Sequence, residues 1–167
     1  KRRVKVKAGP IEKTIDVKSI ANRAAVFVGW EVPGWEDRKA AQLLNLAVLV
    51  LQKQLRERIR EQEGLTYSTA AFYRPSRAMR NTSVLGTFLT ADPQKARLAM
   101  TLARRITEDL AANGPSAADL ATAKKQLDTS LEQTLKEPGF WVGKLGELLY
   151  RDRDLEYYKN VRKSYAK

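Results

Sequence analysis

The chain has 167 residues, of which 43% are hydrophobic and 30% are charged, a composition typical of one globular domain with its own core. It contains no histidine and no cysteine, which excludes the usual Ser-His-Asp and Cys-His catalytic sites and the His-Glu-x-x-His zinc motif. The formal net charge of +12 is compatible with a nucleic acid, an anionic membrane surface or an acidic partner domain, and equally with a solvated basic surface.

Two further features bound the organisation of the chain. The longest apolar stretch, Leu43–Leu51, is far shorter than the roughly 20 residues that cross a bilayer, so we predict no membrane span. The first residue is Lys rather than Met, and no internal repeat or low-complexity linker divides the sequence. We therefore expect a single domain over residues 1–167 that is a fragment of a larger protein.

The first 30 residues predict three strands. Lysine and valine alternate over residues 1–7, as in an edge strand whose charges discourage pairing with other chains. After the turn at Gly9-Pro10, Ile11–Val17 also alternates, with its aliphatic side chains on one face. Ala24–Trp30 is rich in apolar, β-branched and aromatic residues, which favours a buried strand.

A long helix is expected over Glu36–Glu63. Its first half is leucine-rich, and its last turns carry several cations, which the helix dipole favours near a C-terminus. Gly64 is the expected residue just beyond the helix, because glycine adopts a left-handed conformation without a Cβ penalty. Two alternating segments follow, Thr66–Tyr73 and Thr82–Thr90, and predict an antiparallel hairpin.

The remainder of the chain is expected to be helical. Asp92 is placed as the N-cap of a helix with Pro93 at its first position, and this helix ends at Asn113. Ser116 begins a second helix that runs to about Lys136. Shorter helices are expected over residues 140–150 and 155–165. This order predicts the α+β class, with a mainly antiparallel sheet packed under helices.

The junction between the long helix and the following strand carries the most specific motif. Residues 59–68 read I-R-E-Q-E-G-L-T-Y-S, with Arg60 and Tyr67 on either side of Gly64. Together with Thr90-Ala-Asp-Pro93 and Leu120-Ala-Thr-Ala-Lys-Lys-Gln-Leu127, this motif resembles the second, non-zinc half of the insulinase/pitrilysin zinc peptidases, the family of the mitochondrial processing peptidase. The resemblance covers roughly nine-tenths of the chain.

The resemblance implies a catalytically incomplete domain of a zinc metallopeptidase that completes the active-site chamber and binds the peptide substrate. Arg60 would bind a backbone carbonyl or carboxylate of the substrate, and Tyr67 would hydrogen-bond the scissile carbonyl. The chain alone would not be an enzyme and would hold no metal, because zinc belongs to a homologous partner domain on the same or a separate chain. Bacterial relatives of this kind are often exported, which suggests the periplasm.

Two alternatives stay open at this point. One alternative is a scaffold domain from a catalytically silent member of this family, which acts by protein–protein association. Arg60 and Tyr67 would then be structural, with Arg60 complementing the helix dipole and pairing with Glu57 or Glu63. A nucleic-acid-binding module ranks last, because the basic residues are scattered over every segment and no nucleic-acid motif is present.

Overall fold

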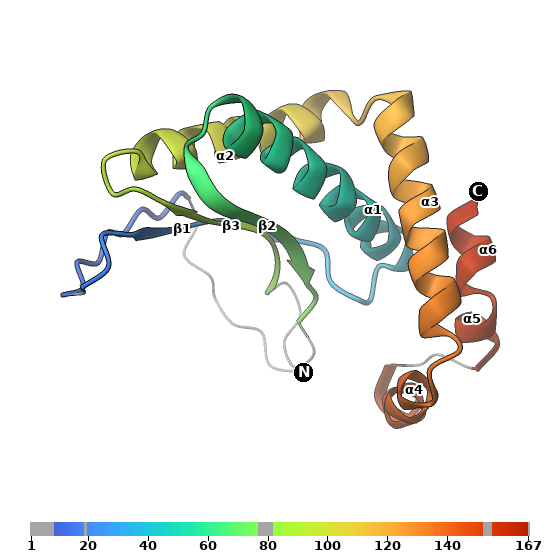
Figure 1. Cartoon of the computed structure of the whole chain (residues 1–167). Coiled ribbons are helices and arrows are strands. Elements are labelled where there is room, and N and C mark those ends of the chain that lie inside the picture. Colours follow the sequence, from blue (N-terminus) through green and yellow to red (C-terminus); the bar gives the residue numbers. More distant parts are fainter. Residues whose placement is uncertain (1–8, 19, 77–81, 152–154, 167) are drawn as a thin grey trace. The chain divides into compact units, whose positions relative to one another are not determined.

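The computed structural model describes residues 9–18, 20–76, 82–151 and 155–166, which fall into two compact units, Lys1–Gly114 and Pro115–Lys167. The first unit contains a three-stranded sheet, and the second contains only helices among its described residues (Figure 1). The combination of helices with an antiparallel sheet confirms the predicted α+β class. The expectation of a single domain over residues 1–167 stays a prediction.

The sheet consists of β1 (Ala24–Val32), β2 (Thr66–Arg74) and β3 (Ser83–Ala91) in the order β1-β3-β2, and both strand pairs are antiparallel. The predicted hairpin of β2 and β3 is therefore confirmed. Each strand alternates between residues that face the helices and residues that face away, because successive side chains point to opposite sides of a sheet.

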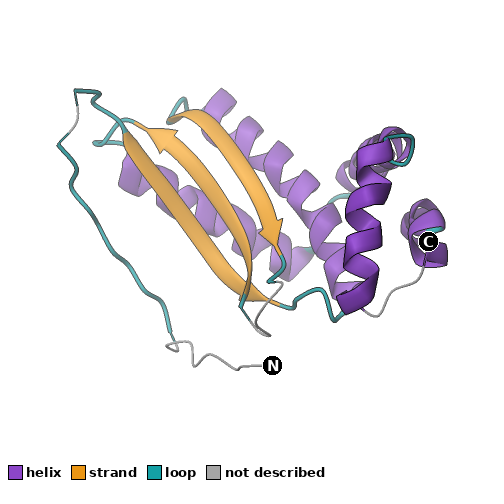
Figure 2. Cartoon of the chain, turned by 90° about the horizontal axis from the view of Figure 1, so that it is seen from below, coloured by secondary structure: helices purple, strands orange, loops and turns teal. Residues whose placement is uncertain are grey.

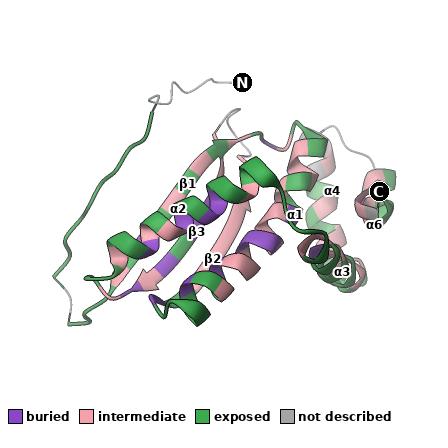
Figure 3. Ribbon diagram, turned by 90° about the horizontal axis from the view of Figure 1, so that it is seen from above, coloured by how far each residue is buried: buried purple, intermediate pink, exposed green. Residues whose placement is uncertain are grey.

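One face of the sheet is covered by α1 (Arg38–Leu55), the π-helix that continues it (Arg56–Gln62) and α2 (Ala96–Asn113), as Figures 1 and 3 show. A π-helix has one more residue in each hydrogen-bonded turn than an α-helix. Burial of apolar side chains between these helices and the sheet is the main stabilising term. The core comprises Val26, Leu51, Leu55, Ile59, Leu65, Leu89, Ala91, Ala99, Ala103 and Ile106.

The side chain of Gln52 links α1 to the outer strand β2 by hydrogen bonds. Its Nε2 donates to the Thr69 carbonyl at 2.9 Å, and its Oε1 accepts from the Ala71 amide at 2.7 Å. These backbone groups lie on an edge strand, where unpaired donors and acceptors invite pairing with another chain. The amide of Gln52 satisfies both groups and fixes the position of α1 along β2.

None of the helices described for the first unit lies on the opposite face of the sheet (Figure 2). Phe27 and Phe88 on this face are 59% and 39% exposed. The ring of Phe72 packs beside Phe27 with 5.8 Å between the ring centroids, and it lies over Gly86, where a Cβ atom would come within 2.5 Å of the ring. Glycine at position 86 therefore makes room for the aromatic pair.

The strand expected over Ile11–Val17 is not present. Ile11, Ile15 and Val17 are 70%, 69% and 77% exposed, and the segment runs as a loop (Figure 2). Glu12 of this segment forms an ion pair with Arg97 of α2 at 3.4 Å. Alternation measures amphipathicity only, whereas a strand also needs a neighbouring backbone to pair with. The strand expected over residues 1–7 lies outside the described residues.

The helix starts follow their capping residues, with one correction. Asp37 caps α1 by accepting from the Ala40 amide at 2.9 Å, and Ser116 caps α3 (Ala117–Thr134) in the same way, by accepting from the Asp119 amide at 3.0 Å. The placement of Asp92 as an N-cap was wrong. Its carboxylate accepts from the Gln94 amide at 2.8 Å within a turn, and α2 begins only at Ala96.

The second unit contains α3 (Ala117–Thr134), α4 (Pro138–Arg151), α5 (Leu155–Lys159) and α6 (Val161–Ala166). The helix expected over residues 155–165 is divided at Asn160, whose side-chain amide donates to the Glu156 carbonyl at 3.0 Å. Aromatic side chains join α4 to α5, since Phe140 packs edge-to-face on the buried Tyr158 with 6.2 Å between centroids.

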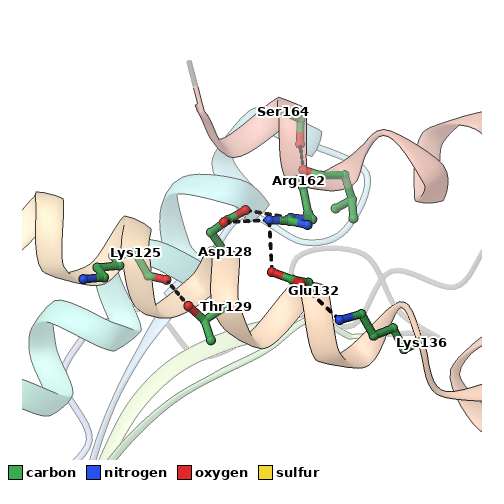
Figure 4. Close-up of polar contacts among 8 residues, drawn as sticks. Lys125, Asp128, Thr129, Glu132, Lys136, Arg162 and Ser164 are labelled. Atoms are coloured by element: carbon green, nitrogen blue, oxygen red, sulfur yellow. Dashed lines mark hydrogen bonds and ion pairs between the residues drawn. The ribbon is translucent and has the colours of Figure 1, made fainter.

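An ion-pair cluster joins α3 to α6 (Figure 4). The guanidinium of Arg162 donates two hydrogen bonds of 2.8 Å to the carboxylate of Asp128, and it lies 3.5 Å from Glu132. Glu132 also accepts from Lys136 at 3.0 Å. The hydrogen bonds from Arg162 hold the pKa of the Asp128 carboxyl below its ordinary value.

This lowered pKa predicts the acid sensitivity of the α3–α6 contact. Asp128 is ionised in full above its ordinary pKa of about 4, so its stabilising effect is complete there and is lost as the pH falls through the lowered pKa. We expect the α6 amide signals in an NMR titration from neutral to strongly acidic pH to report this loss. In Asp128→Asn the corresponding step should be absent. An unchanged step in that variant would contradict the assignment.

Candidate functional site

The site predicted from the sequence lies where the helix layer joins the sheet. Here the last seven residues of the long helix, Arg56–Gln62, form the π-helix. Segments of this kind are rare and occur frequently at functional sites. Only Ile59 in it is buried, and the side chain of Arg60, one residue further along the chain, is exposed. The π-helix thus places Ile59 in the core and Arg60 outside it.

Gly64 turns the chain from this helix into β2. Its φ of +58° is left-handed, as expected for the residue just beyond a helix. Across the turn, the Leu65 amide donates a hydrogen bond of 3.0 Å to the Ile59 carbonyl. This bond spans one residue more than the hydrogen bond that commonly closes the end of an α-helix at a left-handed glycine. Ile59 and Leu65 are both in the core, so the turn is held by a hydrogen bond and by burial.

A β-bulge interrupts β2 at Tyr67. Thr66 pairs with Ala91 and Ser68 pairs with Thr90, so Tyr67 is the extra residue with no partner on β3. Strict alternation would place Tyr67 on the same face as Thr69 and Ala71. The bulge breaks that alternation, and bulges commonly redirect a side chain in this way. As a result the Tyr67 side chain is 60% exposed.

The surroundings of Arg60 remove one of its structural explanations. Within the described part of the chain, Arg60 makes no ion pair. Glu57 lies 3.8 Å from Lys53, and Glu61 lies 3.5 Å from Arg56. The pairing of Arg60 with Glu57 or Glu63 is therefore not formed, and the Arg60 side chain is exposed.

Arg23 is a residue of this region that the sequence did not single out. It lies in the connection before β1, and its guanidinium carbon is 5.4 Å from the centre of the Tyr67 ring. No pattern in the sequence marks it, because the contact depends on how β1 and β2 are arranged across β3. The turn at Gly64 places Arg60 and Tyr67 at the same end of the sheet, where Arg23 also lies.

The residues of this chain do not fit a zinc site. Zinc in proteins is held by histidine, cysteine and carboxylate side chains, and this chain has neither histidine nor cysteine. Among the described residues no three acidic side chains gather closely enough to hold a metal ion. The described helices also include none that combines the length and the hydrophobicity of a membrane span.

Comparison with protein families resolves what this domain is. Residues 2–127 match the family model described as the peptidase M16 inactive domain. The chain belongs to this family. The match confirms the resemblance to the inactive half of the insulinase/pitrilysin peptidases, and the domain is therefore of the non-catalytic type. A comparison with curated protein sequences gave no match.

Solved structures have the same fold. A peptidase M16 inactive domain from Pseudomonas fluorescens is 19% identical with a TM-score of 0.75, and the similarity covers 87% of this chain and 35% of that one. The periplasmic protease PqqL from Escherichia coli is 19% identical with a TM-score of 0.67, covering 89% and 16%. A chain of Complex III2 from Candida albicans is 13% identical with a TM-score of 0.70, covering 89% and 38%. This chain thus spans well under half of each.

The left-handed turn at Gly64 gives a direct test of how the site is built. No atom lies within 4 Å of the position that a Cβ would take at Gly64, so a substitution there changes backbone strain alone. We expect Gly64→Ala to lower the free energy of unfolding by about 1–2 kcal/mol. Gly64→Asn is the matched control, because asparagine tolerates this conformation better than other residues. Equal losses in the two variants, measured by urea denaturation, would contradict the strain argument.

Proposed function

We propose that this domain completes the active-site chamber of a zinc metalloendopeptidase and binds the peptide substrate through Arg60 and Tyr67. The observation that carries the proposal is the pair of backbone irregularities at the helix–strand junction. The π-helix carries Arg60 and the bulge carries Tyr67, and both side chains are exposed at one end of the sheet. Irregularities of both kinds are enriched next to functional sites.

Arg60 is suited to hold an extended peptide. Its guanidinium is always charged and offers a planar fork of donors that matches a carboxylate or two backbone carbonyls. Because the side chain has no ion-pair partner in the described part of the chain, substrate binding breaks no existing salt bridge. Its role in the proposal is to orient the peptide.

Tyr67 is suited to act on the scissile bond. Its hydroxyl is a neutral donor, and an aimed donor stabilises the negative charge that develops on a carbonyl oxygen during hydrolysis. The zinc-bearing partner domain supplies the metal and the activated water for this chemistry. Closure of the two domains over the peptide excludes water, which strengthens the hydrogen bond from Tyr67.

The proposal predicts the kinetics of two variants when the domain is combined with its zinc-bearing partner domain. Tyr67→Phe should lower kcat by about 10²–10³, because one donor to the developing oxyanion is lost. Arg60→Ala should lower kcat/KM by about 10- to 100-fold, the effect of one hydrogen bond to a charged group. Both losses are measured by steady-state peptide hydrolysis.

Matched controls separate these effects from damage to the fold. Arg58→Ala removes another exposed arginine of the same π-helix, and Tyr73→Phe removes a hydroxyl that donates to the Pro33 carbonyl at 2.9 Å. Both controls should keep their activity. If Tyr67→Phe and Arg60→Ala are as active as the controls, the assigned roles are wrong, and the domain acts as a scaffold by protein–protein association.

A further inference from the structure

We propose that Arg23 is a positioning residue for Tyr67: its guanidinium holds the tyrosine ring in the orientation in which the hydroxyl meets the substrate. This inference rests on the proposed function of Tyr67. It adds a third residue, from a different strand end, to a site that the sequence motif confines to residues 59–68.

The sheet register brings the two residues together. Ala24 pairs with Ala91, and Ala91 pairs with Thr66, so these three residues form the last row of the sheet. Arg23 directly precedes Ala24, and Tyr67 directly follows Thr66. Arg23 therefore reaches across the end of the central strand β3, and its guanidinium carbon lies 5.4 Å from the centre of the Tyr67 ring, within the range of a cation–π contact.

The contact with Arg23 matters because the strand that contains Tyr67 does not fix the orientation of its ring. The bulge leaves Tyr67 without a partner residue on β3, and the side chain is 60% exposed. A ring in that position is not locked by core packing, and catalytic donors must be held to within a fraction of an ångström of the productive geometry. A planar cation over the ring face restricts the ring while leaving the hydroxyl free.

The backbone of Arg23 is held in place by the structure on both sides of it. The Arg23 amide donates to the Ala21 carbonyl at 2.9 Å, and β1 begins at the next residue. The backbone of Arg23 is therefore fixed between this turn and the first residue of β1. No opposite charge contacts Arg23 among the described residues, so the tyrosine ring is its partner there.

The test is a double-mutant cycle in the domain combined with its zinc-bearing partner domain. Arg23→Ala should lower kcat by about five- to tenfold with KM unchanged, and Arg23→Lys should recover part of the loss because it keeps a cation over the ring. In the Tyr67→Phe background, Arg23→Ala should have no further effect, because no hydroxyl is left to position.

Arg74→Ala is the matched control. The guanidinium of Arg74 lies 5.1 Å from the centre of the Phe72 ring, and both residues belong to β2. The substitution Arg74→Ala therefore removes an equivalent cation–π contact away from the site, and kcat should not change. A second readout is the NMR signal of the Tyr67 ring in tyrosine-labelled protein, which should sharpen in Arg23→Ala as the ring becomes mobile.

Three results would overturn the inference in different ways. An equal loss of kcat from Arg23→Ala with Tyr67 and with Phe at position 67 would show that Arg23 acts independently of the hydroxyl, and the proposed function would stand. A rise in KM alone would show direct substrate binding by Arg23, with the same consequence. A Tyr67→Phe variant of full activity would overturn both the inference and the proposed function.

Discussion

The hydrogen bond from the Leu65 amide to the Ile59 carbonyl, closed around the left-handed Gly64, is the constraint on which the rest of the structure depends. It joins the helix layer to the sheet at a point where both bonded residues are buried in the core. Ile59 lies in the core and its neighbour Arg60 is exposed, while on the strand side the bulge after Thr66 leaves Tyr67 exposed. A single closure thus serves the stability of the first unit and the geometry of the candidate site.

Each of the two backbone irregularities beside this closure, the π-helix and the β-bulge, contains one of the two candidate site residues. Regular helix and regular strand geometry would continue the hydrogen-bond ladders and the alternation of side chains through residues 56–68. The π-helix and the bulge give up that regularity, and they lie at the positions of Arg60 and Tyr67. The absence of histidine from the chain agrees with its family, whose model describes an inactive peptidase domain.

Sequence reasoning predicted those parts of the fold that local chemistry determines. The apolar run of β1, the cap at Ser116 and the glycine at position 64 each specify their own structure through burial, a side-chain acceptor or a permissive φ. It failed at Ile11–Val17 because pairing depends on a neighbour that no local pattern specifies. The bulge at Tyr67 and the contact with Arg23 were missed for the same reason, since both depend on register against β3.

The central claim is that this domain contributes peptide binding to a zinc site carried elsewhere. The most direct test is complementation: peptide hydrolysis is measured for this chain with added Zn²⁺, for the zinc-bearing domain alone, and for the two together. The account predicts hydrolysis only in the combination. No hydrolysis in the combination, although the zinc-bearing domain binds its metal and associates with this chain, would contradict it.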